Sequence, residues 1–534
     1  MPTSKESIIR ERTANLINFK IKTGANCTPE ALEEELVHDI QDAISIANQA
    51  GGVKIKQVDR LSPASIADLE AGLFPGRLRK INLSGELNSS QCVIGMYQES
   101  GQDAGIYSTD ENKLRALFRR YCYTMTEKEY NSIIARLNEI LPTTYPTMDR
   151  DLIAVNNGIF DYSTKKLLPF SPDYVFTAKS RVNYNQNAKN VVIHNDEDGT
   201  DWDVESWMNE LSDDTEVVKV FWQVLGAILR PNVNWDKSVW LYSETGNNGK
   251  GTLCELMRQL CGEGSYASIP LVDMGKDFML EPLVGVTSII VDENDVGTYI
   301  DRAANLKTLI TGDVLTINRK FQKPIALRFH GMMVQCLNEM PRIKDKTNSL
   351  YRRQLFIAMT KCFTGMERKY IKHDYLHRPE VLEYVMYKVL NTDYYELDTP
   401  QACVDALDEY KEFNDPVLQF VREILPDLKW DLAPFGFLYD LYRAWYKKNF
   451  SGEQFISKQS FVKDLLADLK DVPGWTCPDK KKPWRPQGKM DVAEPLIEEY
   501  QLTDWINPQY VSSKDIDKKC LPALKATYKG IVRV

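Results

Sequence analysis

The sequence predicts an α/β fold built around a phosphate-binding loop, and three observations support this prediction. The segment from Lys237 to Tyr242 is short and apolar, as in a buried parallel strand. A glycine-bearing loop follows, and the next residues repeat at the spacing of an amphipathic helix: Leu253, Leu256, Met257 and Leu260. A second apolar segment, 287–291, ends in two carboxylates, as strands do at the ligand-binding edge of an α/β sheet.

The composition limits the class of protein. The chain of 534 residues is long enough for roughly three or four domains, and its hydrophobic share of 43% is that of a globular protein. The net charge of −9 argues against a protein that coats nucleic acid over its whole surface, but it is compatible with a local basic channel. The ten cysteines form no CxxC pair, which disfavours zinc and disulfide frameworks and favours a reducing compartment. Because we find neither a signal segment nor a membrane-spanning stretch, we expect a cytoplasmic protein without a membrane partner.

Periodicity and composition divide the chain into four predicted domains. Residues 1–95 are expected to be helical. No residues in this segment have the spacing of a catalytic motif. Residues 96–200 combine amphipathic helices with a hairpin signalled by an Asn-Gly pair between apolar segments. Residues 201–395 contain the phosphate-binding core. Residues 396–534 have helical periodicity followed by short extended segments, which predicts a winged-helix-like domain.

The loop has the residue types that a backbone needs to curl around a phosphate: Gly246, Asn247, Asn248, Gly249, Lys250, Gly251 and Thr252. The N–H groups at the start of the following helix would face the anion, and Lys250 would add a positive charge beside it. Two positions depart from the usual pattern. Glu244 stands where glycine is usual, and Gly251 stands where a magnesium-binding Ser or Thr is usual. An ordinary glycine-rich turn is therefore the alternative.

Polar side chains follow two further apolar segments. Asp292 could hold Mg²⁺ through water, and Glu293 could orient an attacking water molecule. The alternative is a buried strand that ends in a solvated acidic turn. Asn338, which follows the apolar segment 331–337, could bind a terminal phosphate or the attacking water, or could cap the next turn.

Basic residues complete the set of candidates. Residues 311–324 predict a hairpin that presents a basic and aromatic cluster for single-stranded nucleic acid: Arg319, Lys320, Phe321 and Lys323. An exposed charged hairpin without a ligand is the alternative. Arg352 and Arg353 precede another apolar segment, and arginine is the side chain that a neighbouring subunit supplies to a phosphate in its transition state.

The order of these motifs resembles that of the superfamily 3 helicases, and most closely the primase–helicases of phages, plasmids and nucleocytoplasmic viruses. GNNGKGT at 246–252 is similar to their phosphate loop, and IIVDEND at 289–295 to their Walker B strand. TGDVLTINRKFQKP at 311–324 resembles their DNA-contacting hairpin, and QCLNEMPRIKD at 335–345 their sensor strand. The resemblance covers about residues 96–450 well and the last eighty residues weakly, and it leaves residues 1–95 without a counterpart. We expect no primase domain in this chain.

The resemblance implies an AAA+-like ATPase core that works as a ring, usually a hexamer, with ATP and Mg²⁺ between subunits. One subunit would supply Lys250, Asp292, Glu293 and Asn338, and its neighbour would supply Arg352 or Arg353. Thr252 is the candidate for the magnesium hydroxyl, since Gly251 occupies the usual position. The hairpins would pull single-stranded DNA in the 3′-to-5′ direction.

The expected function is that of a replicative helicase of a phage, plasmid or other mobile element. It would act on forked DNA in a bacterial host or at a viral replication site, with a separate primase or replication protein as partner. The alternative is a nucleotide-gated initiator or loader that binds an origin and recruits another helicase.

Overall fold

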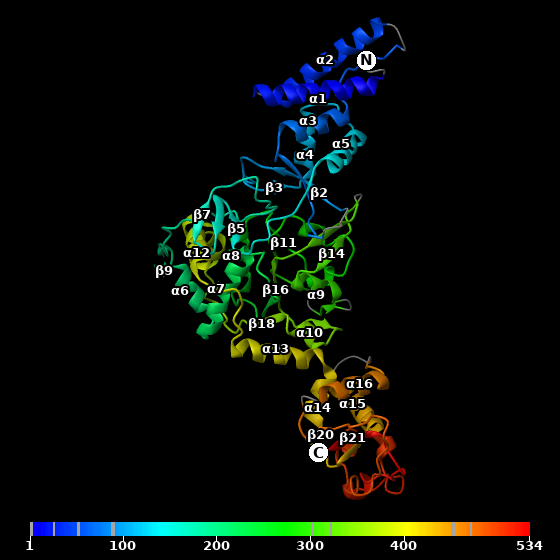
Figure 1. Cartoon of the computed structure of the whole chain (residues 1–534). Helices are drawn as coiled ribbons and strands as arrows, with labels where there is room; N and C mark the ends of the chain where they lie inside the picture. The colour runs from blue at the N-terminus through cyan, green and yellow to red at the C-terminus, as the bar shows by residue number, and fades with distance from the viewer. Residues whose placement is uncertain are drawn as a thin grey trace. The chain divides into compact units, whose positions relative to one another are not determined.

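A computed structural model describes residues 4–24, 27–50, 54–86, 91–295, 297–300, 303–320, 323–449, 455–469 and 472–534. The chain divides into two compact units, Met1–Leu407 and Asp408–Val534, and the division falls within helix α13 (Gln401–Asn414). The mixed α/β class is confirmed, since helices and strands alternate through both units (Figure 1). No helix among the described residues is long and apolar enough to cross a membrane.

The N-terminal part of the first unit packs helices against a four-stranded sheet of order β3-β2-β1-β4. The helices are α1 (Lys5–Thr23), α2 (Pro29–Gln49), α3 (Pro63–Leu73), α4 (Glu111–Arg119) and α5 (Glu127–Ile140). The strands are β1 (Leu78–Ile81), β2 (Val93–Tyr97), β3 (Tyr107–Ser108) and β4 (Thr143–Thr144). One core runs from Ile8 to Leu137 through both predicted N-terminal domains. The predicted boundary between residues 95 and 96 is therefore wrong, because it falls inside β2, which pairs with β1.

The next part is a set of short antiparallel strands. They are β5 (Leu152–Val155), β6 (Gly158–Asp161), β7 (Lys166–Leu168), β8 (Ile193–His194) and β9 (Asp201–Trp202). The predicted hairpin is present, with Val155 opposite Gly158 and the pair Asn156-Asn157 in the turn. The side chain of Asn157 fixes the turn, since its amide donates to the carbonyl of Tyr184 at 3.0 Å and its oxygen accepts from the amide N–H of the same residue at 2.9 Å.

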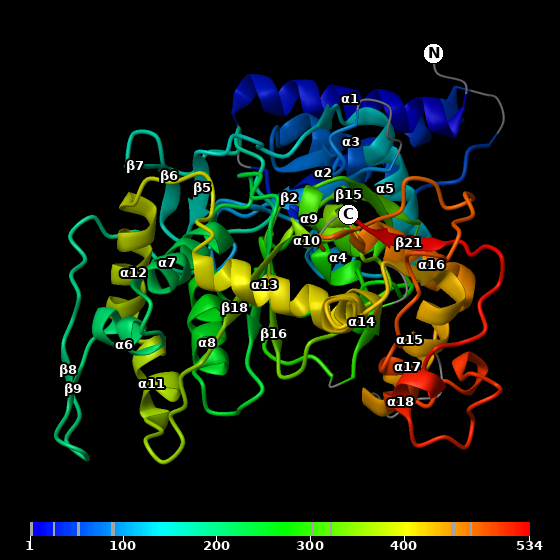
Figure 2. The same ribbon diagram turned by 90° about the horizontal axis from the view of Figure 1, so that it is seen from below.

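A five-stranded sheet of order β11-β12-β16-β10-β18 forms the centre of the first unit, and its neighbouring strands are all parallel. The strands are β10 (Ser238–Tyr242), β11 (Tyr266–Ala267), β12 (Ser288–Val291), β16 (Met332–Leu337) and β18 (Gln354–Ala358). The helices α7 (Thr215–Leu229), α8 (Lys250–Cys261) and α12 (Pro379–Asn391) pack on one another (Figure 2). All six residues of β16 are buried, as expected for a central parallel strand.

Shorter elements complete this part of the unit. The helical ones are α6 (Val204–Glu210), η1 (Leu271–Asp273), η2 (Glu281–Leu283), α9 (Ala304–Thr311), α10 (Asn348–Tyr351), α11 (Lys369–His373) and η3 (Tyr375–His377). The strands are β13 (Tyr299–Ile300), β14 (Val314–Ile317), β15 (Ile325–Arg328) and β17 (Arg342–Ile343).

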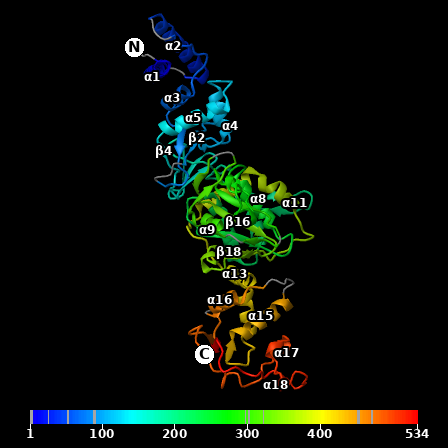
Figure 3. The ribbon, with the colours of Figure 1, turned by 90° about the vertical axis from the view of Figure 1, so that its right-hand side faces the viewer.

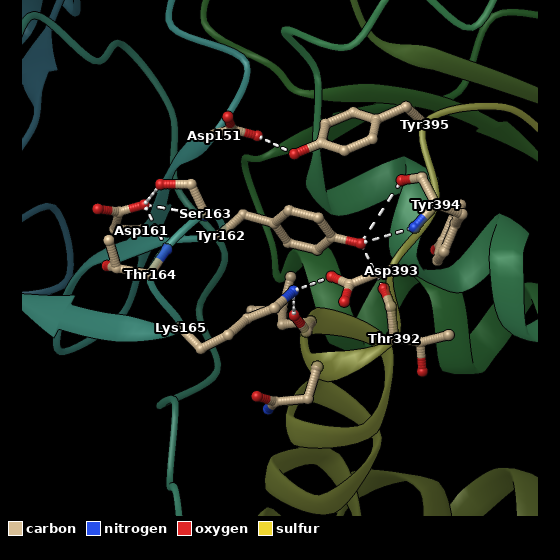
Figure 4. Close-up of polar contacts among 12 residues, drawn as sticks. Asp151, Asp161, Tyr162, Ser163, Thr164, Lys165, Thr392, Asp393, Tyr394 and Tyr395 are labelled. Carbon is tan, nitrogen blue, oxygen red and sulfur yellow. Dashed lines mark hydrogen bonds and ion pairs between the residues drawn. The ribbon is translucent and has the colours of Figure 1, made fainter.

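A polar joint ties the turn between β6 and β7 to the end of α12 and the segment that follows it (Figure 4). The Tyr162 hydroxyl donates to the carbonyl of Thr392 and accepts from the amide N–H of Tyr394 at 3.1 Å. Lys165 donates to the carbonyl of Leu390 at 2.9 Å. Arg230, which is fully buried, lies with its guanidinium carbon 3.6 Å from the centre of the Tyr162 ring. The predicted domain 96–200 is thus held directly against a helix of the predicted domain 201–395.

The second unit has its own aromatic core. Figure 3 shows the helices and strands of this unit in yellow to red. Its helices are α14 (Pro416–Ile424), α15 (Phe435–Asn449), α16 (Lys458–Asp468), α17 (Leu496–Glu499), η5 (Thr503–Trp505) and α18 (Ile516–Lys519). Its antiparallel sheet has the order β19-β21-β20, from β19 (Leu432–Pro434), β20 (Trp475–Thr476) and β21 (Gly530–Arg533). The prediction of three helices followed by short strands is met in part: β20 and β21 follow α15 and α16, whereas β19 precedes both helices. The winged-helix assignment itself stays a prediction.

Candidate active site

The loop between β10 and α8, residues 243–249, is shaped by two left-handed residues. Asn247 has φ of 53° and Gly249 has φ of 88°, a region that glycine and asparagine enter most readily. The Asn248 side chain holds the bend, because its amide donates to the carbonyl of Thr245 and its oxygen accepts from the amide N–H of Lys250 at 3.2 Å. The loop therefore ends with the first N–H groups of α8, a helix long enough to attract an anion to its N-terminus.

Lys250 begins this helix and is only 5% exposed. Its ammonium donates to the carbonyl of Ser243 at 3.1 Å, so the side chain folds back along the inside of the loop. Burial lowers the pKa of Lys250 from its usual value. An anion in the loop would stabilise the charged form of this buried ammonium. The buried lysine therefore favours binding of an anion there.

Asp292, Asn338 and the loop lie at one edge of the central sheet. Asp292 is the first residue after β12, Asn338 is the first after β16, and the loop follows β10. These three strands are parallel neighbours, so their carboxyl ends reach the same edge. Asn338 and Glu293 are exposed there, while Asp292 is partly buried. The sequence prediction that these side chains converge on one edge thus agrees with the sheet order.

Asn294 fixes this edge and was not identified from the sequence. Its amide donates to the Gln335 side chain at 2.9 Å and to the carbonyl of Cys336 at 3.0 Å, and its oxygen accepts from the amide N–H of Leu271 at 2.9 Å. All of these groups are buried. The residue therefore holds the chain after Asp292 against the end of β16.

Two basic side chains beside Asp292, Arg258 and Lys372, were also not predicted from the sequence. Arg258 Nη1 lies 3.5 Å from Asp292 Oδ2, and Lys372 Nζ lies 3.8 Å from the same oxygen. A Cβ atom on Gly251 would lie 3.1 Å from Asp292 Oδ1 and 3.3 Å from Lys372 Nζ. The missing side chain at Gly251 therefore leaves more room for this ion pair.

A cavity of about 310 Å³ opens beside the loop. Its lining combines apolar, basic and acidic side chains with Asn247, Asn248, Gly249, Gly251 and Thr252 of the loop and helix: Trp207, Leu211, Phe363, Met366, Ile371, Arg368, Lys369, Lys372, His373, Glu210 and Glu367. Glu210 pairs with Arg368, and Glu367 accepts from the Asn247 side-chain amide. The segment after β18 closes over the loop, since the amide N–H of Phe363 donates to the carbonyl of Asn247 at 2.7 Å. Apolar walls with a few polar groups are typical of small-molecule sites, and the volume is at the lower end for them.

The two arginines lie at the opposite edge of the sheet. Arg353 directly precedes β18, and its carbonyl accepts from the amide N–H of Ser238, the first residue of β10, at 2.8 Å. Its guanidinium donates to the Ser349 hydroxyl at 2.6 Å and its side chain is 13% exposed. Arg352 is exposed, with its carbonyl bound by Lys237 Nζ at 2.7 Å. The same chain therefore does not bring either arginine to the loop.

The predicted basic hairpin is formed by β14 and β15, with Ile317 opposite Ile325. Arg319 is turned toward the hairpin itself, where its Nη2 donates to the carbonyl of Lys323 at 3.2 Å, and it lines a polar cavity of about 550 Å³. Burial lowers the pKa of Arg319. Lys320 and Lys323 are exposed, and Phe321 lies outside the described residues.

Three family models match parts of the chain. Residues 30–213 match the family described as D5 N terminal like, residues 412–507 match the one described as Poxvirus D5 protein-like, and residues 241–353 match a family of unknown function, DUF5906. The two D5 matches confirm the resemblance to the superfamily 3 primase–helicases. They also correct its limits, because the first begins at residue 30 and includes most of the segment that the motifs left without a counterpart.

Solved structures give weaker likenesses. The A form apo structure of the NrS-1 C-terminal region is 14% identical, with 89% of this chain and 100% of that chain covered and a TM-score of 0.42. A JCV helicase with a bound acetamide compound is 14% identical, with 44% and 62% covered and a TM-score of 0.26. Comparison with curated proteins gave no match. With identities and TM-scores this low, the assignments rest on the family models and on the geometry of the site.

Proposed function

We propose that this chain, which resembles the D5 primase–helicases, is an ATP-dependent DNA helicase of a phage, plasmid or other mobile element. One observation carries the proposal. Lys250, Asp292 and Asn338, which could bind and activate a phosphate, lie at one edge of the sheet, and the exposed Arg352 lies at the other. A phosphate-hydrolysing site divided in this way is completed by a second copy of the chain, as in a ring.

The residues present fit ATP and Mg²⁺. The N–H groups of the loop and the Lys250 ammonium would hold the phosphates, and the apolar walls of the adjoining cavity would hold the base. Asp292 would hold hydrated Mg²⁺, which neutralises charge on the phosphates when bound. Gly251 has no hydroxyl, so Thr252, which lines the same cavity, or a water molecule would take that position. Glu293 and Asn338 would orient the attacking water.

We assign the transition-state arginine to Arg352 of a neighbouring subunit. The strand that separates it from the loop edge has five residues, which span about 17 Å. Arg353 is held by Ser349, whereas Arg352 is exposed. An exposed guanidinium is free to reach a phosphate across a subunit contact without breaking hydrogen bonds of its own chain.

The exposed lysines of the β14–β15 hairpin would contact the phosphates of single-stranded DNA, with 3′-to-5′ travel expected for the superfamily. A homo-hexameric ring, forked DNA and a separate primase or replication protein are the partners that follow from this role. The proposal includes no membrane partner.

A forked duplex with one labelled strand tests the proposal. We expect ATP and Mg²⁺ to support strand separation by the full chain, single strands to stimulate hydrolysis, and Lys250→Ala to lower hydrolysis by about 10²–10³-fold and strand separation with it. Tight duplex binding with neither activity would contradict the proposal. That outcome would instead support the origin-binding initiator or loader.

A further inference from the structure

Two cysteines that are 82 residues apart in the sequence meet beneath the loop. Cys254 lies on α8, one turn after Lys250, and Cys336 lies near the end of β16. Their Sγ atoms are 3.1 Å apart, and the two residues are 0% and 1% exposed. With the carboxylate of Asp292 they form a cluster whose donor atoms all lie within 4.8 Å of one another. Among the described residues, no other group of three such side chains is drawn together in this way.

We propose that Cys254, Cys336 and Asp292 bind a thiophilic divalent cation of the Zn²⁺ or Cd²⁺ type. Zinc binds thiolate sulfur at about 2.3 Å and carboxylate oxygen at about 2.0–2.2 Å, so donors around a tetrahedral ion lie about 3.6–3.8 Å apart. The three donor atoms need to move by only about 1 Å to reach that spacing. Asp292 opens the site to solvent, since its side chain is 31% exposed, and water would supply the fourth ligand.

The charges around the cluster suit a metal bound by thiolates. On binding, each thiol gives its proton to solvent, so one cation replaces two protons and no electron is transferred. The ion then faces two thiolates and one carboxylate, which leaves one excess negative charge. Lys250 interacts electrostatically with both cysteines and with Asp292, and Arg258 lies 3.5 Å from the carboxylate. These cations offset the excess charge.

The site would act on hydrolysis through Asp292, and this consequence rests on the proposed function. One carboxylate cannot serve Mg²⁺ at the phosphates and a soft cation at the thiols together. Thiolates select the soft ion, whereas Mg²⁺ prefers oxygen ligands. A thiophilic cation would therefore inhibit hydrolysis by withdrawing Asp292 from the phosphates.

Titration with Co²⁺ tests the site without reference to activity. We expect the full chain, kept reduced with a phosphine, to show a near-ultraviolet sulfur-to-cobalt charge-transfer band that saturates at one equivalent and disappears when Zn²⁺ is added. The double variant Cys254→Ala/Cys336→Ala should lose the band. The matched control Cys261→Ala/Cys403→Ala, which removes two other buried cysteines, should keep it. An unchanged band in the first double variant, or no band in the unaltered chain, would overturn the proposal.

Two further measurements test the role of Asp292 in the metal site and the effect of the metal on hydrolysis. Asp292→Asn keeps both thiols, so the band should persist with Co²⁺ affinity at least tenfold weaker; an unchanged affinity removes Asp292 from the site. Hydrolysis of ATP at constant Mg²⁺ should be inhibited by Zn²⁺ and restored by a zinc-selective chelator. Cys254→Ala/Cys336→Ala should need at least tenfold more Zn²⁺, and equal sensitivity would overturn the inhibitory role. If the chain does not hydrolyse ATP, the proposed function fails while the Co²⁺ band still decides the site.

Discussion

The two edges of the central sheet differ in how their charged side chains are held. At the carboxyl edge, Lys250 is buried against the carbonyl of Ser243, and Asp292 has two cations within 4 Å. At the amino edge, Arg353 is held by its own chain and Arg352 is exposed. The first edge is organised in advance by internal contacts, and the second presents a charge for an external partner. Under the proposed function, a complete site takes its two edges from different copies of the chain.

Removal of Arg352 gives the largest expected effect. We expect Arg352→Ala to lower kcat for ATP by about 10³–10⁵-fold, the range for arginines supplied by a neighbour, while binding of a fluorescent nucleotide stays unchanged. Single-turnover hydrolysis and equilibrium binding measure the two quantities. Arg353→Ala is the matched variant, and its main effect should be a lower melting temperature, because it loses the contact with Ser349. A larger loss of kcat in Arg353→Ala would reverse the assignment.

Removal of Lys250 tests the carboxyl edge. We expect Lys250→Ala to lower kcat/KM by about 10²–10³-fold, because a preorganised positive charge at the phosphates is lost. Mixing this variant with Arg352→Ala tests whether one site takes residues from two copies of the chain. If the site is shared, mixed assemblies contain intact sites and recover part of the activity, whereas a site confined to one chain would leave the mixture as inactive as its components.

Removal of Lys372 should have a smaller effect. Its ammonium lies beside Asp292 and lines the same cavity as the loop, but it is about one-third exposed and therefore partly screened by solvent. We expect Lys372→Ala to raise the Mg²⁺ concentration for half-maximal hydrolysis or to lower kcat by about tenfold. Lys369→Ala, one turn earlier in the same cavity, is the control and should change hydrolysis little. Equal effects of the two variants would show that hydrolysis depends on the total positive charge of the cavity and not on the contact of Lys372 with Asp292.

The hairpin should affect DNA but not basal hydrolysis. We expect Lys320→Ala/Lys323→Ala to leave hydrolysis without DNA unchanged and to weaken stimulation by single strands. The slope of log affinity against log salt should fall by about 0.7 for each phosphate contact removed. Lys128→Ala, an exposed lysine on α5, should leave the slope unchanged. A normal response of the double variant to single strands would exclude the hairpin from the DNA path.

The smallest effect is expected at the polar joint around Tyr162, which lies at neither edge of the central sheet. Tyr162→Phe removes a hydroxyl that bonds Thr392 and Tyr394, and we expect it to lower the free energy of unfolding by about 1 kcal/mol. Denaturant titration measures this change. Hydrolysis and nucleotide affinity should stay within twofold of the unaltered chain. A large loss of activity with normal stability would mean that the joint also controls the site.

The sequence predicted those parts of the site that follow directly from strand order. Lys250, Asp292 and Asn338 each follow an apolar segment, and parallel strands bring such residues to one edge. The contacts of Arg258 and Lys372 with Asp292 depend on how α8 and α11 pack, which periodicity does not encode. The Cys254–Cys336 contact was missed for the same reason, because cysteine spacing reports only sites formed by nearby residues. The boundary at residue 95 was misplaced because β2 is too short to give a clear alternating pattern.

The hydrogen bonds between β10 and β18 have a mechanical consequence for the proposed ring. The ladder begins where the chain at Arg352 and Arg353 binds Lys237 and Ser238, and β10 ends at the loop that would hold ATP. In the proposed ring, a force that one nucleotide exerts on Arg352 would pass along β18 and β10, within the five-stranded sheet, to the next nucleotide. Cooperativity between neighbouring sites would then need no additional moving part.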